Sequence, residues 1–341
     1  MSLKLILSLV LAVLTFGRLP ASGQNANRPA AASKPNLLVI VADDLGYADV
    51  GFNGGKTIAT PNLDRLATSG INLTDFRACP VCSPTRAGVL TGRWPLRFGL
   101  MRSVIPPWST NGLPAQEKTL PELLAPAGYE QRAIMGKWHL GHARREFLPL
   151  AHGFTSFYGH YNGAIDYFDH TREGEMDWHR NQRAVREEGY STDLLGADAA
   201  KFIREAPAGK PWFLYLPFNA PHGPFQAKPA DLEKYPQFKM PERRAYAAMV
   251  DCLDQAIGRV LAAVEARPDA TNTLILFFSD NGGIPKVGSS NAPWRGAKLT
   301  VYEGGTRVCA LIRWPAGRLT GGGRFDGRIG YIDVLPTLLA A

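Results

Sequence analysis

Two kinds of side chain in this sequence could carry out chemistry together: a set of oxygen ligands, and a cysteine close to an arginine. The oxygen ligands form two adjacent pairs, Asp43-Asp44 and Asp280-Asn281. Carboxylate and amide oxygens are hard ligands, which favours Ca²⁺ or Mg²⁺ over Zn²⁺. Asp and Asn are also common turn residues, so each pair taken alone would be a solvated turn.

The cysteine lies in the segment Cys82-Ser83-Pro84-Thr85-Arg86, which continues as Ala-Gly-Val-Leu-Thr-Gly-Arg. Pro84 suits the first turn of a helix. Cys82 would then lie at the positive end of the helix dipole, where an anion is favoured, and Arg86 would share its face of the helix. A cysteine at a helix N-terminus beside an arginine is also the usual setting of a reactive thiol.

Other interpretations of this cysteine compete. It could be a buried structural residue or half of a disulfide, since the chain has four cysteines whose pairing the sequence leaves open. With Cys79 it forms a C-x-x-C, but a thioredoxin-like redox domain would be much shorter and would not explain the carboxylates. A zinc ribbon needs a second C-x-x-C, which Cys252 and Cys309 do not form. A cysteine phosphatase would have a longer loop between Cys82 and Arg86.

Apolar runs bounded by turn residues alternate with amphipathic segments, which is typical of βαβ units around a mainly parallel, buried sheet. The expected strands are 37–41, 132–135, 212–217, 273–278 and 308–313. Reactive residues follow four of them: the two oxygen pairs, Lys137 with His139, and His222. Ligands bind beyond the carboxyl ends of the strands in open α/β sheets, so we expect one composite site there.

Helix signals separate the expected strands. Thr60 and Gly70 bound one helix, and Thr119 with Glu122 forms a capping box that begins another, which Gly128 would end. Between residues 246 and 266, apolar residues recur at helical spacing and predict one buried stripe: Met249, Leu253, Ile257, Val260 and Val264.

Composition and the N-terminus restrict the class of protein. The chain has 341 residues, 45% hydrophobic and 20% charged, which is typical of a globular protein. The net charge of +8 fits an anionic partner, but no dense Lys/Arg run indicates nucleic-acid binding. Residues 1–23 are typical of an export signal, whose apolar run is too short for a stable membrane span. Residues 24–34 are typical of a flexible linker. A buried or membrane-anchoring helix is the alternative; export predicts a periplasmic or secreted protein.

The segment from Cys82 to Arg93 resembles the signature of the type I sulfatases, a family that includes the arylsulfatases and N-acetylgalactosamine-6-sulfatases. Further blocks of that family occur in the expected order: 43–47, 60–67, 136–141, 221–224, 279–283 and 295–307. The resemblance covers residues 35–341 as one catalytic domain. It implies an α/β fold of the alkaline phosphatase type, with a large, mainly parallel or mixed sheet between helices.

The resemblance also implies an activity, that of a sulfuric ester hydrolase. In this family the cysteine is oxidised after translation to Cα-formylglycine, whose hydrated aldehyde attacks sulfur and then expels sulfate. Such a conversion of Cys82 would need a formylglycine-generating or anaerobic sulfatase-maturating enzyme. The substrate would be a sulfated small molecule or glycan. Alternatives are a phosphodiester or phosphonate monoester hydrolase of the same superfamily and a catalytically silent protein that binds sulfated glycans.

By the same resemblance, particular residues acquire roles. Calcium, with Mg²⁺ as second choice, would be held by Asp43, Asp44, modified Cys82, Asp280 and Asn281.

The catalytic groups implied by the family are two histidines and three cations. Arg86 and Lys137 would stabilise the formylglycine and the developing charge. His139 is the candidate base for sulfate release, and His222 with Lys298 would bind sulfate and protonate the leaving oxygen. Taken alone, His139 would be a packed core histidine and Lys298 a surface lysine.

Two departures from the family pattern stand out. Thr85 replaces the usual serine, which could weaken recognition by the maturing enzyme. The chain stops after 332–341, where relatives continue into a smaller C-terminal subdomain, so we expect a truncated domain with exposed apolar surface and part of the pocket missing. Residues 154–180, rich in aromatic and charged side chains, would be a pocket-lining insertion or a plain surface loop.

Overall fold

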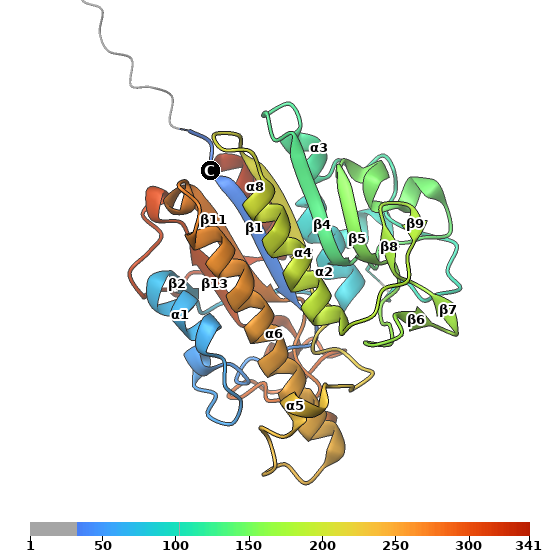
Figure 1. Ribbon diagram of the computed structural model, residues 1–341, viewed down its shortest axis with the longest axis vertical. Coiled ribbons are helices and arrows are strands. Elements are labelled where there is room, and N and C mark those ends of the chain that lie inside the picture. The colour runs from blue at the N-terminus through green and yellow to red at the C-terminus, as the bar shows by residue number, and fades with distance from the viewer. Residues whose placement is uncertain (1–32, 102) are drawn as a thin grey trace, which may run out of the picture. The chain divides into compact units, whose positions relative to one another are not determined.

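The computed structural model describes residues 33–101 and 103–341 (Figure 1). The expected export signal and almost all of the expected linker lie outside these residues. The folded unit runs from Lys34 to Ala341. Among the helices of the described part, none has the length and apolar character needed to cross a membrane.

A ten-stranded sheet, in the order β14-β2-β13-β11-β1-β10-β4-β5-β8-β9, forms the centre of this unit. Its middle is parallel and consists of β11 (Thr273–Ser279), β1 (Asn36–Ala42), β10 (Trp212–Pro217), β4 (Gln131–Lys137) and β5 (Ser156–His160). The outer strands are β13 (Ala310–Arg313), β2 (Ile71–Leu73), β14 (Gly323–Phe325), β8 (His179–Arg180) and β9 (Arg183–Ala184). Antiparallel pairs flank the parallel middle, so the sheet is mixed.

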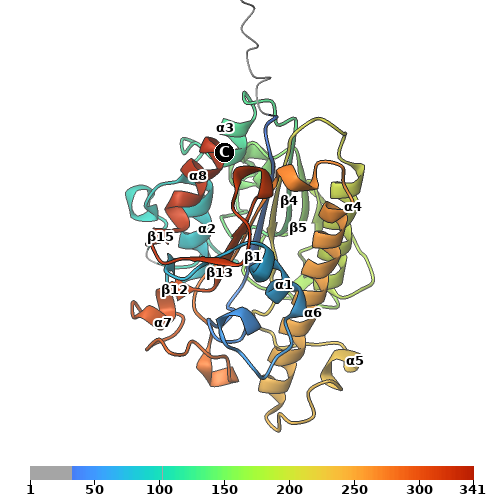
Figure 2. The same ribbon diagram turned by 90° about the vertical axis from the view of Figure 1, so that its left-hand side faces the viewer.

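Helices cover both faces of the sheet (Figures 1 and 2). On one face lie α1 (Pro61–Ser69), α4 (Ser191–Glu205) and α6 (Pro241–Glu265). On the other lie α2 (Cys82–Thr91), α3 (Leu120–Leu124) and α8 (Val334–Ala340). Side chains alternate along β1: Leu38 and Ile40 join the first core, and Leu37, Val39 and Val41 the second. Burial on both sides explains why these strands are continuous apolar runs.

The predicted fold class, an α/β domain with a large mixed sheet between helices, is confirmed, and four of the five expected strands are present. The expected strand 308–313 is wrong as a single element. The chain changes sheets at Cys309: β12 (Arg307–Val308) pairs with β3 (Phe76–Arg77) in a three-stranded sheet completed by β15 (Ile329–Gly330), and β13 joins the central sheet. The apolar residues of both β12 and β13 are buried, so a single apolar run in the sequence forms two strands.

The expected helices begin at their predicted signals, but α3 ends at Leu124, before the predicted stop at Gly128, because the chain continues in turns. Thr60 precedes α1, and Gly70 follows it. Thr119 and Glu122 make the capping box of α3, with the Thr119 N–H 3.0 Å from the Glu122 carboxylate. The five stripe residues of α6 are all buried, as predicted. The remaining elements are short: β6 (Thr171–Arg172), β7 (Glu175–Met176), α5 (Pro229–Leu232) and α7 (Glu303–Thr306).

Candidate active site

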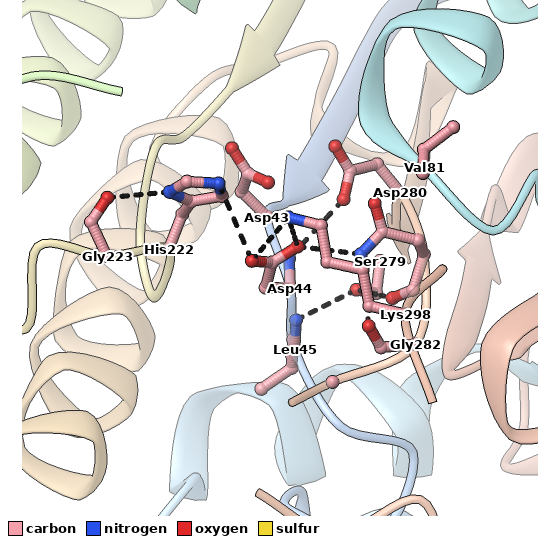
Figure 3. Close-up of polar contacts among 12 residues, drawn as sticks. Asp43, Asp44, Leu45, Val81, His222, Gly223, Ser279, Asp280, Gly282 and Lys298 are labelled. Carbon is pink, nitrogen blue, oxygen red and sulfur yellow. Dashed lines mark hydrogen bonds and ion pairs between the residues drawn. The ribbon is translucent and has the colours of Figure 1, made fainter. Parts of the chain in front are cut away.

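The two pairs of oxygen ligands meet because β1 and β11 are parallel neighbours. Ala42 ends β1 opposite Ser279, the last residue of β11, so the four residues that follow lie side by side. The N–H of Asp280 donates to the carbonyl of Ala42 at 2.9 Å, and the N–H of Asp44 lies 3.3 Å from Oδ1 of Asp280. The residues that follow β1 and β11 therefore lie together at the carboxyl ends of these strands, as the sequence predicted (Figure 3).

Ser279 ties the two strand ends together, a function that the sequence did not suggest. Its Oγ accepts a hydrogen bond from the N–H of Leu45 at 3.1 Å and donates one to the carbonyl of Asn281 at 2.8 Å. Figure 3 draws the contact between Leu45 and Ser279 as a dashed line. The only signal in the sequence was its position inside the 279–283 block, since a lone serine at a strand end is ordinary.

The oxygen atoms left without partners fit a hard cation. Oδ1 of Asp43 and Oδ1 of Asn281 are buried and accept no hydrogen bond from the described residues. The amide nitrogen of Asn281 donates to Asp44 at 2.7 Å, which leaves its oxygen free. Ligand atoms of Asp43, Asp44, Cys82 and His222 all lie within 4.8 Å of one another. The carboxylate and amide oxygens at this centre suit Ca²⁺ or Mg²⁺, whereas the Cys82 sulfur and the His222 nitrogen are softer donors, and His222 was not among the expected ligands.

Cys82 is the first residue of α2, whose ten residues are all buried. Its side chain is only 1% exposed. Arg86 does not serve the thiol: its Nη2 lies 2.8 Å from Oδ2 of Asp280, and its Nη1 donates to the carbonyl of Lys137 at 3.0 Å. Burial raises the pKa of the Cys82 thiol to about 12, although Lys137 opposes this. The expected setting of a reactive thiol is wrong, because desolvation outweighs the nearby positive charges.

Two lysines pair with the carboxylates that follow β1. Lys137 Nζ bonds Asp43, and both side chains are fully buried. Lys298 Nζ contacts both carboxylate oxygens of Asp44, at 2.7 and 2.8 Å. With the pair formed by Arg86 and Asp280, the centre contains three carboxylates and three cations. These formal charges cancel before any ion is added.

Burial and mutual repulsion separate the acidities of two of the carboxyl groups. Burial, reinforced by the charge of Asp43, raises the pKa of Asp280 to about 7. Burial alone would also raise the pKa of Asp43, but the positive charges of Lys137, Arg86 and Lys298, with the ring of His222 nearby, together hold it below its usual range. Asp43 is therefore the firmly ionised member of this pair.

The two histidines expose different ring nitrogens. Nε2 of His139 lies 3.1 Å from the carbonyl of Ile105, and its Nδ1 is buried without a partner. Nδ1 of His222 lies 2.6 Å from the carbonyl of Gly223, and its Nε2 lies 3.6 Å from Asp44. Because a carbonyl can only accept, the free lone pair is on Nδ1 of His139 and on Nε2 of His222. Burial lowers the pKa of both rings, so both are neutral here.

Figure 3 shows His222 and Lys298 on opposite sides of Asp44.

A further residue supports His222: the hydroxyl of Tyr167 lies 2.7 Å from the carbonyl oxygen of His222 and 2.8 Å from that of Asn219. Tyr167 lies in the segment 154–180, and the same segment supplies Phe168 and other residues to the wall of a hollow of about 730 Å³. None of the candidate catalytic or metal-binding residues lines this hollow, so the role of the segment in the substrate pocket stays a prediction.

The four cysteines are free and buried. Neither a disulfide nor a closed C-x-x-C pair is therefore present. Cys79 instead has its sulfur 3.8 Å from that of Met101.

Comparison with known proteins decides the family. A sequence model of the sulfatases matches residues 35–341. The chain belongs to the sulfatase family. The resemblance in the signature segment is thereby confirmed over the whole folded unit of this sulfatase chain.

Curated sulfatases and solved structures agree with this assignment. Mouse arylsulfatase J is 36% identical over 328 residues, which are 90% of this chain and 54% of that protein. Human N-acetylgalactosamine-6-sulfatase is 36% identical over 91% of this chain and 62% of its own length. The chain thus spans between half and two thirds of these relatives.

Among solved structures, Ps i-CgsB in complex with k-i-k-neocarrahexaose superimposes with a TM-score of 0.85 at 38% identity, over 90% of this chain and 71% of that chain. The PsFucS1 sulfatase from Pseudoalteromonas sp. gives a TM-score of 0.78 at 30% identity, over 90% and 67%. The sulfatase fold of this chain is therefore shown by sequence and by structure.

Proposed function

We propose that this chain hydrolyses sulfate esters at the centre formed around Cys82. The observation that carries the proposal is the arrangement itself: a buried residue 82 among three carboxylates, three cations and two neutral imidazoles, beyond the carboxyl ends of parallel strands. Membership of the sulfatase family supports the same chemistry. An ordinary thiol with a raised pKa would be a poor nucleophile, so residue 82 is proposed to act as formylglycine.

The proposed metal is Ca²⁺, with Mg²⁺ as second choice, held by Asp43, Asp44, Asp280 and Asn281 together with residue 82. The unpartnered oxygens of Asp43 and Asn281 support this assignment. Because the protein charges at the centre already cancel, a divalent ion leaves an excess of two positive charges. A bound ion would supply charge that neutralises the sulfate oxygens.

The proposed modification supplies a hydrated aldehyde, whose two hydroxyls serve as nucleophile and as the group that later releases sulfate. Arg86 and Lys137 are proposed to stabilise this group and the charge that develops beside it. The conversion would be made by a formylglycine-generating or anaerobic maturating enzyme. Thr85, which departs from the family pattern, is buried, and its Oγ1 lies 2.9 Å from the backbone nitrogen of Cys79.

Both histidines present a ring nitrogen that can take up a proton, and the two are proposed to act at different steps. Nδ1 of His139 presents a buried lone pair, which is the form required of the base for sulfate release. Nε2 of His222 carries the lone pair in this tautomer, so it would first take up a proton, and the imidazolium beside Asp44 would then pass that proton to the leaving oxygen. The carbonyl of Gly223 fixes the tautomer of His222, since it requires a proton on Nδ1.

A sulfated carbohydrate is the proposed substrate, with small aryl sulfates as alternatives. The similar protein Ps i-CgsB has been solved in complex with a neocarrahexaose. In this chain, Phe168 is 42% exposed and lies between the hollow of about 730 Å³ and a second one of about 600 Å³, a position from which an aromatic ring can contact a sugar face. The protein is proposed to act after export, in the periplasm or outside the cell.

The test of this function combines mass spectrometry and kinetics on protein from its native host. A tryptic peptide containing residue 82 should have the mass of formylglycine, and the protein should release sulfate from an aryl sulfate faster than it cleaves an aryl phosphate diester. Cys82→Ala should reduce turnover by at least about 10³-fold, because the nucleophile is lost. Cys252→Ala, which removes another buried thiol, is the matched control and should retain activity. Turnover by Cys82→Ala would refute the assignment of the nucleophile.

A further inference from the structure

Asp177 makes an unusual set of hydrogen bonds away from the metal ligands. It is 4% exposed. Its Oδ1 accepts from the N–H of Tyr161 at 2.9 Å and lies 3.1 Å from Nε2 of His179. Its Oδ2 accepts from the N–H of Asn162 at 2.8 Å and from the Asn162 side chain at 2.9 Å. Two consecutive backbone N–H groups therefore point at one carboxylate.

The same two peptide groups hold the residues beyond β4. The carbonyl of His160 accepts from the N–H of Trp138 at 2.9 Å, and the carbonyl of Tyr161 accepts from the N–H of His139 at 3.0 Å. The carbonyl of Tyr161 and the N–H of Asn162 belong to a single peptide unit. That unit connects the His139 N–H to Asp177, and the preceding unit connects Trp138 in the same way. Such chains strengthen each bond by polarisation.

His139 needs this support because its backbone is strained. Its φ is 56°, in the left-handed region that costs a residue other than glycine roughly 1–2 kcal/mol. The imidazole also packs against Gly163, where any Cβ would overlap the ring. The turn from His160 to Gly163 thus contacts both the backbone and the side chain of His139, and Asp177 holds that turn.

We propose that Asp177 is a positioning residue for His139, acting through the two peptide groups of the turn 160–162 to hold the imidazole in place for proton transfer. The expected effect of Asp177 on kcat rests on the proposed function, whereas its expected effect on the order of the turn 160–162 does not. Asp177 touches neither the metal ligands nor the candidate nucleophile by any described hydrogen bond, so its effect has to pass through His139.

The test uses Asp177→Asn in the mature protein. An amide offers one accepting oxygen, so at least one of the two N–H groups loses its partner. We expect faster hydrogen exchange at the amides of His139, Tyr161 and Asn162, with unchanged exchange in β1. We expect kcat to fall by about 10- to 100-fold with KM nearly unchanged, because small misplacements of a catalytic group have effects of this size.

Asp231→Asn is the matched control. Asp231 is likewise 4% exposed, but it bonds Lys228, Lys234 and Gln255 rather than the His139 turn. A comparable loss of kcat in this control would show that lost stability, not positioning, explains the effect. In a His139→Ala background, Asp177→Asn should have little further effect on kcat, because the residue it positions is already absent.

The outcomes separate the two proposals. Unchanged exchange at His139, or an unchanged kcat despite faster exchange, would overturn the positioning role. A further loss of kcat in the His139→Ala background would do the same. Absence of turnover in the unaltered mature protein would instead contradict the proposed function, and the exchange measurement would then still decide whether Asp177 orders the turn.

Discussion

Charged side chains at the centre are fully buried, and each depends on a partner of opposite charge. Arg86, Lys137, Asp43 and Asp280 have no exposed side-chain surface. Removing one partner from such a buried pair costs about 3–5 kcal/mol, because the remaining charge stays uncompensated. Single charge-removing variants will therefore lower stability as well as activity, and the two effects have to be measured separately.

Asp177 allows a prediction about acid stability. Burial would raise its pKa, but the hydrogen bond from His179 and the charge of His160, with the backbone donors, hold the pKa below its usual range. A carboxyl with a lowered folded pKa stabilises the protein above its unfolded pKa, about 3.9, and this contribution is lost as the pH falls through the folded value. The difference in unfolding free energy between the unaltered protein and Asp177→Asn should be constant above about pH 5 and shrink below about pH 4. Urea unfolding at several pH values measures it, and a difference independent of pH would be contrary to this account.

At the scale of single residues, the sequence indicates which groups can react better than it indicates their partners. Asp43 and Asp280 follow apolar runs, so their meeting could be predicted from parallel strand order. That Arg86 turns to Asp280 and away from Cys82 could not, because helical spacing places a residue on a face without determining which neighbour it reaches. Asp177 gave no signal because two of its four hydrogen-bond partners are backbone N–H groups, which no side-chain pattern reveals.

Among the described helices, α2 is the one that the fold encloses most completely, and its packing depends on Gly88. A Cβ at this position would overlap the ring of Tyr331, which lies in the segment leading to α8. Absence of a side chain thus lets the C-terminal segment close over the helix that begins at Cys82. In most exposed helices alanine would be the more stabilising residue, by about 0.5–1 kcal/mol.

Gly88→Ala should therefore destabilise the protein, by about 1–3 kcal/mol, because the ring of Tyr331 has to move. Chemical denaturation measures the change. In a Tyr331→Ala background the same substitution should cost much less, since the overlapping ring is absent. Equal costs in the two backgrounds would mean that the contact with Tyr331 is not what requires glycine.

At the scale of secondary structure, the elements that could be predicted from the sequence are the long and buried ones. Long parallel strands such as β1 and β11 are apolar runs with turn residues at both ends, and α6 has a clear helical stripe. Two-residue strands such as β12 form only where a partner strand already lies alongside. For this reason the run 308–313 could not reveal from sequence that it divides between two sheets.

Across the folded unit, the parallel sheet brings together residues that are distant in sequence. Asn281 and Asp44 are hydrogen-bonded across a separation of 237 positions. Calcium held by these loops would bind the folded chain and not the unfolded one, so it should stabilise the whole unit. The fold class could be predicted because alternating elements imply such a sheet, whereas the small sheets and the hollow beside Phe168 depend on loops without periodicity.

Removal of calcium should lower the melting temperature. At a free calcium concentration 100 times Kd, binding contributes about 2.7 kcal/mol, which corresponds to roughly 5–10 °C for a domain of this size. Calorimetry with and without a chelator measures the shift. Asp43→Asn should abolish the response, whereas Asp254→Asn, a buried carboxyl that bonds the start of α1, should retain it. A chelator response that persists in Asp43→Asn would place the ion elsewhere.

The complete enclosure of α2 also has a consequence for the order of events in the life of the chain. A modifying enzyme must bind several residues on each side of its target. All ten residues of α2, Cys82 included, are buried in the folded domain and therefore inaccessible. The proposed oxidation of Cys82 therefore has to compete with folding during synthesis or export. A chain that folds before modification would keep an inaccessible, unmodified Cys82 and would be inactive. The yield of active protein would therefore depend on the rate of modification relative to the rate of folding.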